Sequence, residues 1–236
     1  LGLREAVEQV VARGAWGVLM RALPNNAVRE AVIALGASAV PHLIQALGDS
    51  ERDVRRAACE ALGQIGDKQA VPHLIQALGD WNWDVRRAAC EALGRIGDVQ
   101  AVPHLIQALG DSYSGVRWVA CGALGQIGDV QAVPALIQAL RDSEVRVRVV
   151  ACEALGQIGD VQAVPALIQA LRDSEWLVRE AACWALGQIG DVQAVPHLIQ
   201  ALGDSEVRVR VAACEALGKI GDPQAVPALS VWAHAG

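Results

Sequence analysis

A 31-residue period runs through most of this sequence. Seven prolines stand 31 residues apart: Pro41, Pro72, Pro103, Pro134, Pro165, Pro196 and Pro227. Six cysteines keep the same interval: Cys59, Cys90, Cys121, Cys152, Cys183 and Cys214. A fixed period of roughly 20 to 50 residues is typical of stacked supersecondary units, and it constrains the fold more than any local motif does. The function must then be sought in what the repeats do not share.

One repeat, residues 49–79, predicts two short antiparallel helices. Asp49 is a typical helix N-cap residue, and apolar residues follow it at helical spacing. Gly66 suits the left-handed end of that helix, and Asp67 can cap the next one. Pro72 lacks an N–H and therefore fits the opening turn of the second helix. A single pair cannot bury both of its faces, so stacked copies should form an all-α solenoid, or superhelix.

These repeats resemble HEAT-like repeats, in particular the short kind named after phycobilisome lyases. That pattern has a proline in the first helix of each pair, an aspartate in the turn and an arginine six residues later, here Pro41, Asp49 and Arg55. The aspartate and arginine recur as Asp80 with Arg86, Asp111 with Arg117, Asp142 with Arg148, Asp173 with Arg179, and Asp204 with Arg210. The resemblance covers about residues 15–233. It implies a structural ladder of hydrogen bonds between the aspartate and arginine side chains of neighbouring repeats.

The period also predicts how the chain is organised. Residues 49–221 hold six regular copies of the second helix without a linker, so we expect residues 1–236 to form a single domain. Residues 222–236 read as a C-terminal helix, in which Trp232 should cover the exposed end of the core.

The first 48 residues keep the pattern only in part. They predict helices at residues 3–14, 15–23 and 25–36, and the last of these carries Asn where the turn aspartate is expected. The ladder should therefore be incomplete at this end. Terminal repeats of solenoids are often atypical because one of their faces meets water.

Charge and cysteine usage exclude several classes of function. A net charge of −6 argues against a general nucleic-acid binder, since such affinity comes largely from neutralising phosphates. Neither a transmembrane run of about 18 apolar residues nor a secretory signal is evident, so no membrane role is expected. Equivalent cysteines on helices about 8–10 Å apart lie beyond the ~7 Å limit for a disulfide. They should be buried and reduced, which favours a cytoplasmic protein.

Four histidines also recur at one position of the repeat: His42, His73, His104 and His197. Because equivalent residues of stacked helices lie about 8–10 Å apart, these histidines should form a partly packed row and not a set of metal ligands. We therefore expect neither a metal site nor a cofactor.

The repeats differ from one another mainly at a few positions of the second helix. Counted from the repeat's aspartate as position 0, positions 3, 4, 7 and 11 vary, and they form one stripe on a helix because they lie three or four residues apart. We call these positions the variable stripe. Five of the seven tryptophans and the only tyrosine lie on it or in the turn before it: Trp81, Trp83, Tyr113, Trp118, Trp176 and Trp184. The stripe lies opposite the apolar core residues of the same helix and should therefore face solvent, and the family resemblance implies that this face is concave.

Tryptophan, tyrosine and arginine are enriched in binding hot spots. We therefore predict that the stripe binds a protein or peptide through twelve residues: Arg52, Arg56, Trp81, Trp83, Arg87, Tyr113, Trp118, Arg146, Trp176, Leu177, Glu180 and Trp184. The alternative is that the aromatic residues only pack between repeats.

The sequence is also similar to the designed alphaRep scaffold, whose randomised positions correspond to positions 3, 4, 7, 8, 11 and 15 here. The cysteine of each second helix, the histidines and the irregular residues 1–48 depart from that design. These departures favour an array of natural repeats over a clone from a designed library.

Three functions follow, of which the first is favoured. A non-enzymatic scaffold would bind a protein or peptide on the variable stripe. A phycobilin-lyase-type enzyme or chromophore-binding protein would need convergent polar groups, and no nucleophile–base pair is evident in the sequence. A nucleic-acid-binding HEAT-like protein is disfavoured because acidic residues share the stripe with the arginines.

Overall fold

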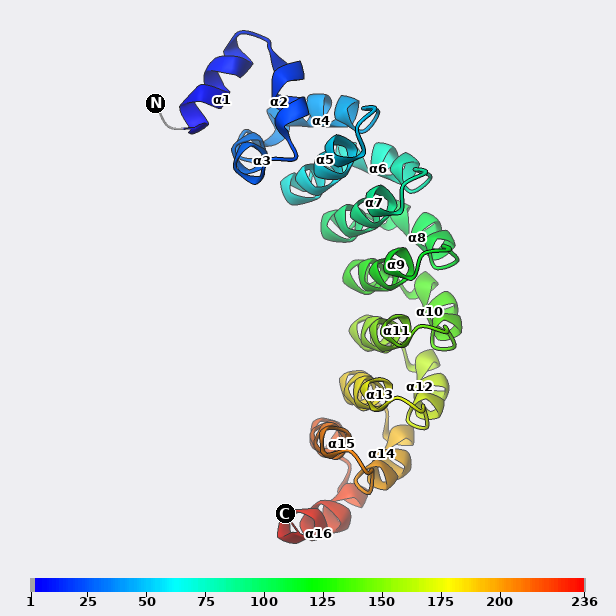
Figure 1. Cartoon of the computed structure of the whole chain (residues 1–236). Coiled ribbons are helices and arrows are strands. Elements are labelled where there is room, and N and C mark those ends of the chain that lie inside the picture. The colour runs from blue at the N-terminus through cyan, green and yellow to red at the C-terminus, as the bar shows by residue number, and fades with distance from the viewer. Residues whose placement is uncertain (1–2, 236) are drawn as a thin grey trace. The chain divides into compact units, whose positions relative to one another are not determined.

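The computed structural model describes residues 3–235, and the side chains of residues 5–230 within them. Between residues 3 and 235 the chain forms sixteen α-helices and seven short 3-10 helices, without a β-strand (Figure 1). It divides into two compact units, unit 1 at residues 1–123 and unit 2 at residues 124–236, with the boundary inside α9 (Ser114–Ile127). The predicted all-α solenoid is confirmed, whereas the single domain stays a prediction.

Unit 1 begins with irregular helices and continues with regular pairs. The three helices expected in the first 36 residues are present. The α-helices are α1 (Leu3–Ala12), α2 (Trp16–Ala22), α3 (Asn26–Ile33), α4 (Val40–Ala46), α5 (Arg52–Ile65), α6 (Val71–Ala77), α7 (Trp83–Ile96) and α8 (Val102–Ala108). Within this unit the long helices α5 and α7 lie side by side, and the short helices α4 and α6 pack against them as a second row (Figure 1).

Unit 2 repeats the regular pair without an irregular end. Its α-helices are α10 (Val133–Ala139), α11 (Val145–Ile158), α12 (Val164–Ala170), α13 (Trp176–Ile189), α14 (Val195–Ala201), α15 (Val207–Ile220) and α16 (Val226–Ala235). The long helices α11, α13 and α15 lie side by side, and α10, α12 and α14 form the other row. The side chain of Trp232, which was expected to cover the core, lies outside the described residues.

A 3-10 helix precedes each short helix from α4 to α16. These are Gly36–Ala39, Lys68–Ala70, Val99–Ala101, Val130–Ala132, Val161–Ala163, Val192–Ala194 and Pro223–Ala225. In the repeat at residues 49–79, Gly66 ends α5 with φ of 75°, a conformation that favours glycine. Asp67 caps the 3-10 helix through the N–H of Gln69, and Pro72 lies in the opening turn of α6. These three predictions are confirmed.

The N-cap prediction for Asp49 is wrong. Its Oδ1 accepts from the N–H of Glu51, and Glu51 itself holds the N-cap position of α5 without a side-chain cap. The aspartate instead closes an Asx turn just before the helix. The same turn recurs at Asp80, whose Oδ1 accepts from the N–H of Asn82.

The predicted ladder is confirmed inside each unit. An arginine donates from Nε and Nη2 to both carboxylate oxygens of an aspartate 25 residues later, and from Nη1 to backbone carbonyls of its own turn. The observed rungs are Arg55–Asp80, Arg86–Asp111, Arg148–Asp173 and Arg179–Asp204, with Nε–O distances of 2.6 to 2.8 Å. At the irregular end Arg29 instead donates to Asn26 and pairs with Glu60.

Small and branched aliphatic side chains fill the core of each unit. One leucine of every long helix and one of every short helix are fully buried in the regular repeats, as Leu62 and Leu74 show. Five cysteines are buried with them, while Cys214 on α15 is half-buried. All six thiols are free. The histidine row is half-buried, and His42 stacks on Trp16 with 3.9 Å between ring centroids.

No single helix of the described chain has both the length and the apolar character needed to cross a membrane. The segments Asn26–Ile33 and Gly36–Ala46 reach those limits only when they are counted together, across a bend of 117°.

Cys214 should react with a thiol reagent much faster than the other five cysteines. Burial raises the pKa of Cys90 and Cys183 to about 12, and it raises the pKa of Cys59 and Cys152 as well. Because the thiolate is the reactive form, these groups should react slowly at pH 8. Titration with a chromogenic disulfide should show one fast equivalent in the native protein and six in denaturant. Cys214→Ala should remove the fast phase, and six fast thiols in the native protein would contradict the described core.

Candidate protein-binding surface

The variable stripe reaches solvent on the long helices, but most of its side chains are half-buried. Trp176 and Trp184 are half-buried because α13 packs between α11 and α15, and Trp118 on α9 is half-buried as well. On α15, the last long helix, Val207 and Val211 are exposed instead. The stripe is therefore a set of shallow clefts between neighbouring helices and not a row of freely projecting side chains.

Three of the predicted aromatic residues of unit 1 form two separate groups. Trp83 on α7 contacts Tyr113 in the next turn, with 4.2 Å between ring centroids. Trp81 lies in the turn before α7, is 75% exposed, and stacks on the guanidinium of Arg55 at 5.2 Å. Trp81 thus covers a rung of the ladder and does not belong to the stripe, a contact that the repeat pattern did not predict.

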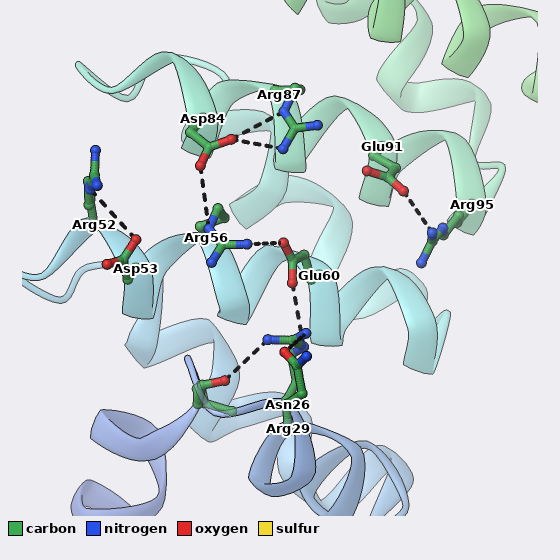
Figure 2. A network of polar contacts seen from close by, with 11 residues as sticks. Asn26, Arg29, Arg52, Asp53, Arg56, Glu60, Asp84, Arg87, Glu91 and Arg95 are labelled. Carbon is green, nitrogen blue, oxygen red and sulfur yellow. Dashed lines mark hydrogen bonds and ion pairs between the residues drawn. The ribbon is translucent and has the colours of Figure 1, made fainter.

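The stripe arginines of unit 1 are paired with carboxylates of the same chain (Figure 2). Arg56 Nη1 donates to Glu60 Oε1 at 2.6 Å, and its Nε lies 3.4 Å from an oxygen of Asp84 on the next long helix. Arg87 binds the other oxygen of Asp84 at 2.8 Å. Arg52 lies 3.6 Å from Asp53 on the exposed edge. In unit 1 the predicted arginines therefore form an ion-pair network that spans α5 and α7.

Unit 2 has a groove at the corresponding place. A cavity of about 410 Å³ opens between α11 and α13. Its lining residues are Val149, Glu153 and Gln157 from α11, and Leu177, Glu180, Ala181 and Trp184 from α13. Three predicted site residues, Leu177, Glu180 and Trp184, thus meet in one cavity. The side of the groove formed by α11 was missed, although it consists of positions 7, 11 and 15 of the preceding repeat.

Two contacts hold the indole ring of Trp184 in place. When the Gln188 amide is oriented with its oxygen toward the available donors, that oxygen accepts from Trp184 Nε1 at 3.0 Å and from Lys219 Nζ at 2.9 Å. The far edge of the ring lies over Gly156, so close that a Cβ at that glycine would be 2.8 Å from Trp184 Cζ3. A ring fixed in this way is ready to receive a ligand without reordering.

The carboxylates of the groove lack partners of their own. In contrast to Glu60 and Glu91, which bind Arg56 and Arg95, neither Glu153 nor Glu180 makes a hydrogen bond or ion pair among the described residues. Burial raises the pKa of Glu153. Outside the lining of the groove, the guanidinium of Arg208 lies 5.5 Å from the ring centroid of Trp176, and Arg146 is exposed on α11.

The other cavities repeat along unit 1 and are features of the fold. Crevices of about 350 and 280 Å³ lie between successive short helices, and each includes the histidine of the repeat, His73 or His104. Among the described residues no group of three or more His, Cys, Asp or Glu side chains is placed to hold a metal ion.

Comparison with known proteins identifies the repeat. A family model for HEAT repeats matches residues 15–81, 40–121, 102–175 and 164–235, which together span nearly the whole chain. The chain belongs to the HEAT-repeat family. The family pattern thus covers the variable stripe and groove as well as the ladder. A search among curated proteins finds no match.

Solved structures show the same HEAT-like architecture. The complex of CpcE and CpcF of phycocyanin lyase from Nostoc sp. is 26% identical, with a TM-score of 0.52, and the match covers 89% of this chain and 90% of that one. An engineered protein is 22% identical over 77% of this chain and 96% of its own, with a TM-score of 0.61. A designed armadillo repeat protein in complex with the peptide (KR)4 is 20% identical over 77% and 99%, with a TM-score of 0.62. The latter two likenesses concern the fold alone.

Proposed function

We propose that this HEAT-repeat chain is a non-enzymatic scaffold that binds a protein or peptide on the variable stripe of its long helices. The observation that carries the proposal is the groove between α11 and α13, where Trp184 and Leu177 line a cavity next to unpaired carboxylates. Binding sites typically combine an apolar lining with a few polar groups that orient the ligand. The repeat fold supplies the rigid helices on which such a site can be held.

Apolar desolvation would provide most of the binding energy. Burying the exposed parts of Trp184, Leu177 and Val149 removes apolar surface from water, at roughly 25 cal/mol per Å². In unit 1, the Trp83–Tyr113 pair and the arginines Arg52, Arg56 and Arg87 would form a second, more polar contact area. Those ion pairs are partly exposed, so they orient a partner more than they add affinity. The other residues proposed to contact a partner are Trp118 on the stripe and Trp81 beside it in unit 1, and Arg146 and Trp176 in unit 2.

A second candidate is a chromophore-binding protein or a lyase-type enzyme. It is favoured by the 26% identity with the phycocyanin lyase complex over 89% of this chain. The groove volume also falls in the usual range for small-molecule sites, about 300–1,000 Å³. Against it, tetrapyrroles carry carboxylate side chains, which would meet Glu153 and Glu180 in the groove. An absorbance shift on mixing the chain with a bilin would favour this candidate over the scaffold.

Peptides selected on the intact chain should lose about thirtyfold in affinity when Trp184 is replaced. The probe is a displayed library of random peptides, and the variant is Trp184→Glu, which carries the residue found at this position in the repeats of Glu153 and Glu215. Truncating an aromatic hot spot costs about 2 kcal/mol, which is roughly thirtyfold. Affinity is measured by fluorescence anisotropy, and helical content by circular dichroism.

The matched control is Val192→Lys, in the 3-10 helix that precedes the short helix α14. Lysine is the residue found at the same repeat position in unit 1, at Lys68. Val192 is 58% exposed and lies in the 3-10 helix Val192–Ala194, outside the lining of the groove, so this variant should bind as the parent does. Unchanged affinity in Trp184→Glu, together with a lowered melting temperature, would show that Trp184 only packs between repeats.

A further inference from the structure

We propose that the groove between α11 and α13 takes an arginine side chain of a positively charged peptide. This inference rests on the proposed function and narrows its partner to one chemical class. It comes from comparing the same repeat positions in the two units, each taken by itself.

In unit 1 an arginine of the chain fills the corresponding space. Arg56, at position 7 of α5, places its guanidinium between Glu60 of its own helix and Asp84 of the next long helix. Next to it, the crevice between α5 and α7 measures about 200 Å³ and is lined in part by Arg95, which binds Glu91. Guanidinium groups thus neutralise the carboxylates of this cleft and occupy part of it.

In unit 2 the sequence removes those cations and keeps the carboxylate. Position 7 of α11 is Val149 where α5 has Arg56, and position 15 of α13 is Gln188 where α7 has Arg95. Glu153 stays at position 11, and Glu180 replaces the arginine at position 7 of the next helix. The resulting cavity is about 410 Å³, and its lining includes two carboxylates and no basic side chain. The groove of unit 2 therefore has open space and negative charge at the place where a guanidinium lies between carboxylates in unit 1.

The geometry of the lining suits arginine better than other cations. A planar guanidinium can donate to a carboxylate and stack on an aromatic ring at the same time, which an ammonium group does less well. The indole rings of this chain already accept guanidinium groups, at 5.2 Å for Arg55 on Trp81 and at 5.5 Å for Arg208 on Trp176. In the groove, Trp184 lies with Glu153 and Glu180, and Val149 and Leu177 can contact the aliphatic stem.

The test uses the full chain and a fluorescein-labelled octapeptide of alternating serine and arginine. Its partner probe has citrulline in place of arginine, which keeps the shape and removes the charge. Anisotropy titration at low salt should show binding of the arginine peptide at least tenfold tighter than that of the citrulline peptide. Equal binding of the two peptides would overturn the inference.

The decisive variant is Val149→Arg, which restores in unit 2 the arginine that Arg56 provides in unit 1. The installed side chain should occupy the groove and weaken binding of the arginine peptide at least tenfold. Val211→Arg is the matched control, because it makes the same change at the same position of α15, where Val211 is exposed and lies outside the lining of this groove. It should change the affinity less than twofold. Equal weakening by both variants would mean that general charge, and not the groove, governs binding.

The outcome also separates this inference from the proposed function. If library-selected peptides still require Trp184 while the arginine peptide fails to bind, the arginine inference is wrong and the scaffold function stands. If neither kind of peptide depends on the groove, both are wrong.

Discussion

Gly187→Ala should destabilise the chain, whereas Gly218→Ala, at the same position one repeat later, should stabilise it. A Cβ at Gly187 on α13 would lie 2.8 Å from Ala216 Cα and 2.9 Å from its Cβ on α15. Backbone at that distance cannot move away without separating the two helices. Overpacking of this kind costs about 1–3 kcal/mol. At Gly218 a Cβ would meet nothing within 4 Å, so the ordinary helix preference for alanine should add about 0.5–1 kcal/mol.

Chemical or thermal unfolding of the two variants beside the parent measures both effects. The changes in unfolding free energy should have opposite signs, which makes the pair informative even if each value is small. If both variants were equally stabilised, the close approach of α13 and α15 would not require glycine at position 187. The same glycine recurs at Gly63 and Gly156, with a Cβ 2.7 and 2.8 Å from the next repeat's backbone, so the constraint belongs to the repeat.

Arg148→Ala should cost about 3 kcal/mol of stability, while Arg210→Ala should cost about 1 kcal/mol. Arg148 binds both carboxylate oxygens of Asp173 at 2.8 and 2.9 Å, and the two side chains are only 12% and 15% exposed. Its loss leaves a nearly buried carboxylate without its cation. Arg210 holds the same place in the last long helix, but among the described residues it donates to the backbone carbonyls of Asp204 and Ser205. Denaturant midpoints of the two variants give the difference, and equal midpoints would contradict a stabilising rung.

The ladder also predicts how stability depends on pH. Burial by itself raises the pKa of Asp173, but the hydrogen bonds from Arg148 and the Glu175 N–H and the charge of Arg148 outweigh it and lower the pKa. A lowered folded-state pKa gives stability that is present above the unfolded value, about 4, and is lost as the pH falls through the folded value. The parent should therefore lose stability below about pH 4 more steeply than Arg148→Ala does. A parallel decline of both proteins would mean that the rung adds nothing to this dependence.

The sequence by itself determined the repeat and its helices. In a solenoid each unit contacts only its neighbours, so a constant spacing in the chain becomes a constant spacing in space. Gly66, Asp67 and Pro72 could be placed at helix ends from local chemistry alone. The pairing of the arginine of one repeat with the aspartate of the next came from the resemblance to HEAT-like repeats. At Asp49 the local pattern was ambiguous, because aspartate is favoured both in an Asx turn and at a helix N-cap. The structure has the Asx turn at Asp49 and the N-cap two residues later, at Glu51.

Much of the candidate site was visible as variation between repeats, but only the tertiary structure decided which residues meet. The variable stripe contained Leu177, Glu180 and Trp184, yet nothing in one repeat predicted that Val149 and Glu153 of the preceding repeat would complete the groove with them. The arginines that looked available, Arg56 and Arg87, are paired with Asp84 across the helices. Contacts of this kind depend on how side chains of two helices interdigitate, and that geometry is set by packing between repeats and not by the sequence of any one of them.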